Sequence, residues 1–206
     1  MGLLKLLVQN PLAFFLIAVP LLYSIILHEL AHGWVAYQMG DSTARRAGRL
    51  SLNPLKHLDP IGTLMLFMFG FGWAKPVPVN FNQLRDRHGA MIAVAAAGVT
   101  ANMLLAFTAM LLDRLLAPSP GGLVEALLYW LAQINIILAA FNLIPLPPLD
   151  GSKILMGFLS PRSQNVLLRI EPYGFFILIG LLYTGVLHPV IAFFNELIRS
   201  IINLAL

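Results

Sequence analysis

Long apolar runs dominate the chain and predict helices that cross a membrane. Four runs contain no Asp, Glu, Lys or Arg: residues 6–27, 89–112, 126–149 and 172–195. About 20 residues cross a bilayer as a helix, so each run is long enough for one span. The pattern predicts an all-α polytopic membrane protein with four to six transmembrane helices. Because no internal repeat or long polar stretch divides the chain, we expect residues 1–206 to form a single transmembrane domain.

A shorter apolar run, residues 60–74, has a different character. It is too short for a comfortable span, and Pro76 and Pro78 prevent a helix from continuing beyond it. Glycine and phenylalanine punctuate it in "LMLFMFGFGWAKPVPV". Irregular backbone is tolerated at membrane depth where protein or a watery cavity shelters it. We therefore expect a membrane-embedded re-entrant hairpin between the first and second main spans.

The C-terminal run, residues 190–206, carries a narrow polar stripe. Asn195, Arg199 and Asn203 recur every fourth residue and so lie on one helix face. This stripe is compatible with an interfacial helix and with a short final span. The pair His188-Pro189 is expected to mark the turn before it.

Composition supports a membrane protein and limits its chemistry. The chain is 59% hydrophobic and 11% charged, whereas soluble domains are about 25% charged. It has no cysteine, so a metal site would use His, Asp or Glu. The net charge of +4 does not indicate nucleic acid, because the basic residues flank apolar runs and form no stripe with interleaved aromatics.

The basic residues also orient the spans. Most of the 13 lie in residues 38–88 and 150–171, which the positive-inside rule assigns to the cytoplasm. The N-terminus and residues 113–125 would then face outward, and a spanning tail would return the C-terminus inside. We expect a multi-pass protein of the cell membrane.

Two histidines and a glutamate follow the first apolar run in "HELAH". His28 and His32 share one helix face, and two imidazoles at that spacing can hold one zinc ion. Glu29 lies beside them, where a carboxylate can activate a metal-bound water. The alternative is a helix whose polar residues only pack against neighbours. A charge at the bilayer centre costs about 2.5–3.5 kcal/mol, which favours the metal site.

A catalytic zinc needs a third protein ligand and an open position. Val35 and Gln38 stand where metzincins continue with Gly and His, which excludes that class. Asp150 in "NLIPLPPLDG" is the strongest candidate, because the prolines open the backbone at the cytoplasmic end of the third span, level with the histidines. As an isolated residue Asp150 is more typical of a cap for a helix beginning near Gly151, and both roles are compatible. The other carboxylates considered, Glu125, Glu171 and Glu196, are less well placed.

These motifs resemble the site-2 protease family of intramembrane zinc metalloproteases, peptidase family M50. The resemblance is carried by "HELAHG" in the first span and "NLIPLPPLDG" after a later one. In addition, "SLNPLKHLDPIGTLM" and "FGWAKPVPVN" resemble the compact prokaryotic branch, which lacks PDZ and CBS domains. The match covers residues 20–155, and several motifs agree in order and spacing.

The resemblance implies an intramembrane zinc metalloprotease. By it, His28, His32 and Asp150 are the zinc ligands and Glu29 is the catalytic base. One Zn²⁺ per chain would serve hydrolysis of a peptide bond within or near a transmembrane segment of a membrane-protein substrate. The site would open toward the cytoplasmic side of the lipid bilayer. Substrates in this family include membrane-tethered regulators, anti-sigma factors and leftover signal peptides.

Two asparagines each have two interpretations. The stretch "AAAGVTANMLLA" is similar to the family's Gly-Pro-x-x-Asn motif, with Gly98 and Asn102 matching and Val99 replacing the proline. Asn102 would be a catalytic donor to the scissile carbonyl, or would join two packed helices. Asn142 matches the first residue of the family's aspartate motif; it would contact substrate or satisfy backbone freed by the prolines.

The hairpin also acquires a role from the resemblance. A helical substrate must unwind before cleavage, and residues 60–80 would hold the unwound segment through a strand edge. His57 is expected to be structural, and Lys75 to anchor the hairpin at the lipid headgroups.

Other functions could use the same residues. A membrane metal-ion carrier should show polar residues along a through-path, and often inverted repeats, neither of which the sequence contains. A catalytically inactive scaffold would be expected to lack Glu29. An amide hydrolase acting on a small lipid is the most remote alternative.

Overall fold

Long helices form the frame of the computed structural model, which describes residues 3–69, 72–84 and 87–206. The helices are α1 Leu3–Gln9, α2 Pro11–Gln38, α3 Thr43–Arg46, α4 Pro60–Phe69, α5 Arg87–Leu116, α6 Leu123–Asn142, α7 Asp150–Met156, α8 Pro161–Ile170, α9 Gly174–Tyr183 and α10 His188–Ala205, with 3-10 turns η1 Pro54–Lys56, η2 Phe81–Gln83 and η3 Glu171–Tyr173. Within these described ranges there is no strand, and one β-bridge pairs Leu58 with Ala74. The predicted all-α fold is confirmed.

Four helical stretches are long and apolar enough to cross a membrane: Pro11–Gln38, His88–Leu116, Leu123–Asn142 and Pro161–Tyr183. The first three correspond to the apolar runs predicted at residues 6–27, 89–112 and 126–149, with shifted ends. The arrangement is that of a multi-pass membrane protein, and the number of spans agrees with the predicted four to six.

The fourth span differs from its prediction. Residues 172–195 do not form one helix, because α9 ends at Tyr183 and α10 begins at His188. Between them Gly185 adopts φ +78°, a left-handed conformation that ends a helix and favours glycine. The candidate span instead begins at Pro161, within the segment that the sequence assigned to a cytoplasmic connection.

The first span also begins later than predicted. The run 6–27 is interrupted at Asn10, whose side chain accepts a hydrogen bond from the N–H of Ala13 at 3.0 Å. Pro11 occupies the first turn of α2, where its missing N–H costs nothing. The chain therefore enters through a short helix, α1, and α2 starts at Pro11.

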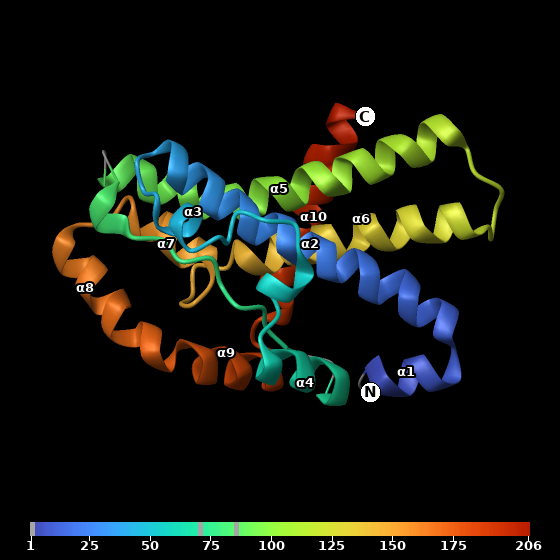
Figure 1. The fold of residues 1–206 in the computed structure, drawn as a ribbon, viewed down its shortest axis with the longest axis horizontal. Coiled ribbons are helices and arrows are strands. Elements are labelled where there is room, and N and C mark those ends of the chain that lie inside the picture. Colours follow the sequence, from blue (N-terminus) through green and yellow to red (C-terminus); the bar gives the residue numbers. More distant parts are fainter. Residues whose placement is uncertain (1–2, 70–71, 85–86) are drawn as a thin grey trace.

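Three helices, α2, α5 and α6, pack side by side and hold the core (Figure 1). The side of α5 that meets its neighbours is rich in alanine and also carries Gly98, and small residues let membrane helices approach closely. The tail helix α10 crosses this bundle steeply in Figure 1, and buries Ile198 and Ile202 against Ile136 and Ala139 of α6. The tail is thus a packed helix, which is not among the four candidate spans.

The hairpin region folds back on itself. Leu58, before α4, and Ala74, after it, lie side by side as an antiparallel bridge. Next to this bridge the N–H of Lys75 donates to the carbonyl of His57 at 2.8 Å. Phe67 of α4 contacts Phe14 near the start of α2, with ring centroids 6.0 Å apart. The arm that follows Leu58 is therefore helical, and it packs against α1 and the start of α2. Whether it enters the bilayer as a re-entrant element stays a prediction.

Candidate metal centre and catalytic cavity

The two histidines of α2 face the same point. His28 and His32 are one turn apart, and each is 7% exposed. Their Nε2 atoms lie 3.0 Å apart, with the ring planes nearly perpendicular at 84°. His28 and His32 thus share one helix face, as predicted, and their Nε2 atoms meet in a buried position.

Asp150 completes the group from a distant part of the chain. It is the first residue of α7, and its Oδ2 atom lies 3.1 Å from the Nε2 atoms of both His28 and His32. The residue that caps α7 is Leu149, and no side chain caps this helix. The capping role considered for Asp150 is therefore wrong, and the carboxylate is directed at the histidines instead.

Hydrogen bonds at the far side of each ring determine which nitrogen carries the proton. His32 Nδ1 lies 2.6 Å from the Val94 carbonyl, which can only accept, so His32 donates through Nδ1. His28 Nδ1 lies 2.6 Å from Oδ1 of Asn102, which also accepts. In neutral imidazoles, both Nε2 atoms are then lone-pair acceptors facing the Asp150 carboxylate.

Three acceptors at this spacing repel one another unless a cation lies between them. Asp150 Oδ2 is buried and has no hydrogen-bond partner among the described residues, as expected for an atom that binds a cation. A tetrahedral zinc ion with bonds of about 2.0–2.1 Å separates its ligand atoms by roughly 3.3–3.4 Å. The observed separations of 3.0 and 3.1 Å are close to that value. The donor set of two imidazoles and a carboxylate fits zinc.

Gly98 of α5 lies directly against this centre. A Cβ atom on Gly98 would lie 2.4 Å from His32 Nε2 and 2.6 Å from His28 Nε2. The space beside the two nitrogen atoms therefore exists because residue 98 has no side chain. The lack of room for a side chain explains why glycine stands at this position of the Gly-Pro-x-x-Asn-like motif.

Asn102 lies behind His28 and is fully buried. Its Oδ1 accepts from His28, and its Nδ2 donates to Oδ1 of Asn135 at 2.8 Å. Asn135 donates in turn to Ser24 Oγ and to the Leu131 carbonyl, each at 2.8 Å. Asn102 therefore joins α2, α5 and α6. The donor role toward a scissile carbonyl stays a prediction.

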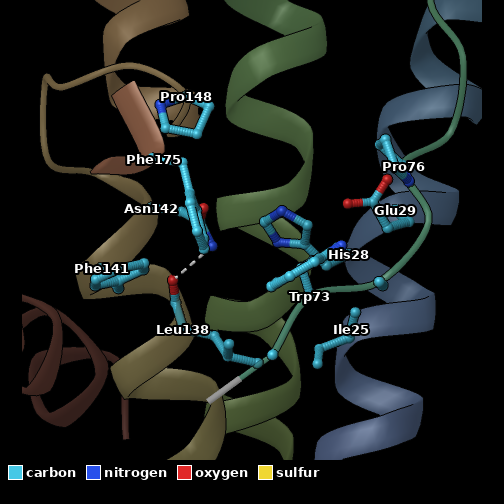
Figure 2. Close-up of a pocket in the computed structure, with 12 residues that line it drawn as sticks. Ile25, His28, Glu29, Trp73, Pro76, Leu138, Phe141, Asn142, Pro148 and Phe175 are labelled. Carbon is cyan, nitrogen blue, oxygen red and sulfur yellow. Dashed lines mark hydrogen bonds between the residues drawn. The ribbon is translucent and has the colours of Figure 1, made fainter. Parts of the chain in front are cut away.

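Glu29 lies at the wall of a cavity of about 540 Å³ between α2 and α6. Its Oε2 accepts the N–H of Val77 at 2.8 Å. In Figure 2, His28 and Glu29 project from α2 on one side, and Phe141 and Asn142 project from α6 on the other. Glu29 and His28, one of the two histidines of the metal centre, therefore line the same cavity.

The rest of the cavity wall is mainly apolar. Trp73 and Phe175, both labelled in Figure 2, line it and pack edge to face, with ring centroids 5.3 Å apart. Asn142 donates to the Leu138 carbonyl of its own helix at 3.0 Å, so it does not satisfy the backbone freed by the prolines. Its side chain lines the cavity, which leaves the substrate-contact interpretation as a prediction.

An extended segment, residues 74–80, runs past Glu29 and is held from two sides. Arg49 donates to the Lys75 carbonyl at 2.6 Å, and the N–H of Lys75 donates to the His57 carbonyl. His57 is buried and donates through Nε2 to the Ser51 carbonyl at 2.7 Å, as expected for a structural residue. These contacts fix the segment at its start.

Asp41 holds the other end of the extended segment. Its Oδ2 accepts the N–H of Asn80 at 2.6 Å, while Oδ1 accepts from the N–H and hydroxyl of Thr43. Burial opposes ionisation of this carboxyl, but the hydrogen bonds outweigh it with help from the charge of Arg46. The pKa of Asp41 therefore lies below its ordinary value.

Sequence reasoning missed Ser24, Asn135, Asp41 and Arg49. A polar side chain inside a charge-free helix was a usable signal for Asn135, because such a group needs a buried partner. Asp41 and Arg49 lie among other polar residues of the α2–α4 connection, so nothing in the local pattern distinguished them.

Comparisons with known proteins agree on one family. The model of a family described as peptidase family M50 matches residues 119–184. The chain is 40% identical over 176 residues to YwhC of Bacillus subtilis, named as a candidate zinc metalloprotease, and the alignment covers 82% of this chain and 80% of that protein. It is 29% identical over 181 residues to Rip2 of Mycolicibacterium smegmatis, named likewise, covering 85% of this chain and 69% of that protein. No solved structure matches significantly.

Proposed function

The chain belongs to peptidase family M50 and is a zinc metalloendopeptidase, and we propose that it cleaves a peptide bond within or near a transmembrane segment of a membrane protein. One observation carries this proposal. Three buried acceptors, from His28, His32 and Asp150, converge beside a cavity that Glu29 lines, between helices long and apolar enough to span a membrane.

In the proposed reaction, His28, His32 and Asp150 hold one Zn²⁺. When bound, the ion lowers the pKa of a water molecule and polarises the scissile carbonyl. Glu29 is the base: Oε2 is engaged by the Val77 N–H, which leaves Oε1 to take the proton from water and pass it to the leaving amine. The Val77 bond also fixes the direction in which the carboxylate points.

The extended segment supplies a backbone edge for an unwound substrate. Leu58 and Ala74 form a pair without mutual hydrogen bonds, since the bond joins their neighbours His57 and Lys75. In an antiparallel pair of this kind the N–H and carbonyl of Ala74 point to the opposite edge. Ala74 lines the cavity, and no described residue hydrogen-bonds its backbone. A substrate strand pairing there would replace its helical hydrogen bonds and pass Glu29.

The membrane side of the site follows from charge. The connections next to the metal centre, from α2 to α5 and from α6 to α8, carry most of the basic residues. The positive-inside rule therefore favours a site open to the cytoplasm in a protein of the cell membrane. The lipid bilayer and a membrane-protein substrate are the partners this arrangement requires.

The test is the variant Glu29→Gln, which keeps the shape of the side chain and removes the base. We expect zinc content to stay near one per chain and cleavage to fall about 10²–10⁴-fold. Membranes containing each enzyme would be compared by mass spectrometry for new peptide ends inside spanning segments. Glu125→Gln is the matched control, because Glu125 bonds Gly121 in the connection between α5 and α6, away from the cavity. Wild-type cleavage by Glu29→Gln would overturn the proposed mechanism.

A further inference from the structure

We propose that Asn135 is a positioning residue that fixes the tautomer of His28 and so raises the affinity of the site for zinc. The inference rests on the proposed role of His28 as a metal ligand. It concerns a side chain that touches neither the metal position nor the cavity, and it follows from a chain of four hydrogen-bonding groups, His28, Asn102, Asn135 and Ser24, across α2, α5 and α6.

The chain has a definite direction, which is set at its far end. Asn135 Nδ2 lies 2.8 Å from the Leu131 carbonyl of α6. A carbonyl only accepts, so the amide nitrogen of Asn135 must face it. The second hydrogen of the same nitrogen goes to Ser24 Oγ, also at 2.8 Å. The orientation of the Asn135 amide is therefore determined by groups outside the metal centre, and its Oδ1 must face Asn102.

That orientation passes to Asn102. Because Asn135 presents an oxygen, Asn102 must present its nitrogen, at 2.8 Å. The reversed Asn102 amide would place two oxygen atoms against each other. With Nδ2 facing Asn135, Oδ1 of Asn102 faces His28 Nδ1 at 2.6 Å and can only accept. The proton of neutral His28 is thereby held at Nδ1, and the lone pair at Nε2 faces Asp150.

His32 shows why His28 needs this support. A helix carbonyl, that of Val94, fixes the His32 tautomer directly at 2.6 Å. His28 instead contacts an amide, which can present either a donor or an acceptor to the ring. Only the Asn135 orientation removes this ambiguity. Ser24, Asn102 and Asn135 are at most 1% exposed, so water cannot easily substitute for a lost partner.

The test measures zinc affinity and the His28 tautomer in the full-length protein in detergent. Asn135→Leu removes the oxygen that orients Asn102, and the leucine that replaces Asn135 has a similar volume. Ser24→Ala removes one partner but leaves the Leu131 carbonyl to orient Asn135. Gln133→Leu is the matched control. Gln133 lies on α6, as Asn135 does, and accepts a hydrogen bond from Arg199 of α10, so its replacement removes a polar contact without touching the two asparagines. Zinc affinity is read by competition with a chelator, thermal unfolding is recorded for each variant, and ¹⁵N-histidine spectra report which ring nitrogen carries hydrogen.

We expect Asn135→Leu to bind zinc about 10-fold more weakly, as for other groups that orient a metal ligand. Ser24→Ala should stay within about threefold of wild type, and Gln133→Leu should lower thermal stability without changing zinc affinity. In wild type the spectra should show hydrogen on Nδ1 of His28, a measurement that needs no variant. Zinc affinity of Asn135→Leu equal to wild type, or His28 bound through Nδ1, would overturn this inference and leave the proposed function standing. A wild type that binds no zinc would overturn both.

Discussion

Replacing Gly98 by alanine tests how closely α5 approaches the metal centre. A Cβ atom there would lie 2.4 Å from His32 Nε2 and 2.5 Å from His28 Cε1, whereas ordinary contacts begin near 3.4 Å. The imidazoles would have to move by roughly 1 Å, about five times the ±0.2 Å within which metal–ligand distances are held. The two rings cannot make that movement and keep both Nε2 atoms on one point.

We therefore expect Gly98→Ala to lower zinc affinity by at least about 100-fold, and cleavage with it. The fold should survive. Overpacking lowers the free energy of unfolding by about 1–3 kcal/mol, and alanine stabilises a helix by up to about 1 kcal/mol relative to glycine. Elemental analysis of purified protein gives zinc per chain, and thermal unfolding gives stability. Gly180→Ala in α9 is the matched control, since nothing lies within 4 Å of a Cβ at that position.

The outcome that refutes this reasoning is simple to recognise. Full zinc content and normal cleavage in Gly98→Ala would mean that α5 does not lie against the imidazoles. Loss of zinc in Gly180→Ala as well would mean that the assay reports general damage to the helices. The expected pattern is loss of zinc in the first variant alone.

Three further predictions follow from the same contacts. Asp150→Ala should remove most of the bound zinc, as measured by elemental analysis, because Asp150 supplies the carboxylate among the three described residues that form the centre. Arg49→Met should leave zinc unchanged and raise KM for a peptide substrate by about 10-fold, since the extended segment loses its bond at the Lys75 carbonyl; Arg49→Lys should recover part of the loss. Because the pKa of Asp41 is lowered on folding, its stabilising contribution should be present above pH 3.8, its ordinary value, and be lost as pH falls through the folded pKa. Unfolding midpoints against pH should therefore fall less steeply in acid for Asp41→Asn than for wild type.

The parts of the fold that sequence predicted well are those with local signals. Helices α5 and α6 contain most of the charge-free runs 89–112 and 126–149, and the end of α6 at Asn142 follows from Pro145, Pro147 and Pro148. The run 172–195 was wrong as one span because absence of charge does not distinguish one helix from two helices joined by a turn. The pair His188-Pro189 was expected to mark a turn, and the structure places that turn just before it, at Gly185, with α10 beginning at His188.

The candidate site divides in the same way. The spacing of His28 and His32 made their shared direction predictable, because it depends on one helix. The position of Asp150 depends on how α6 packs against α2; the sequence made it the strongest candidate for the third ligand, although as an isolated residue it was more typical of a helix cap. Asn135 could not be linked to His28 from the sequence, since their connection passes through Asn102 on a third helix.

The distance along the chain between the halves of the metal centre has a consequence for biosynthesis. His28 and His32 belong to the first long helix to be made, whereas Asp150 follows the third. At about 5–20 residues per second, the ribosome needs about 6 to 24 s to extend the chain from His32 to Asp150. During that interval the nascent chain holds two imidazoles and Glu29 without the carboxylate that completes the centre. Under the proposed function, the growing protein would therefore cut neither neighbouring membrane proteins nor itself until its three central helices have been made.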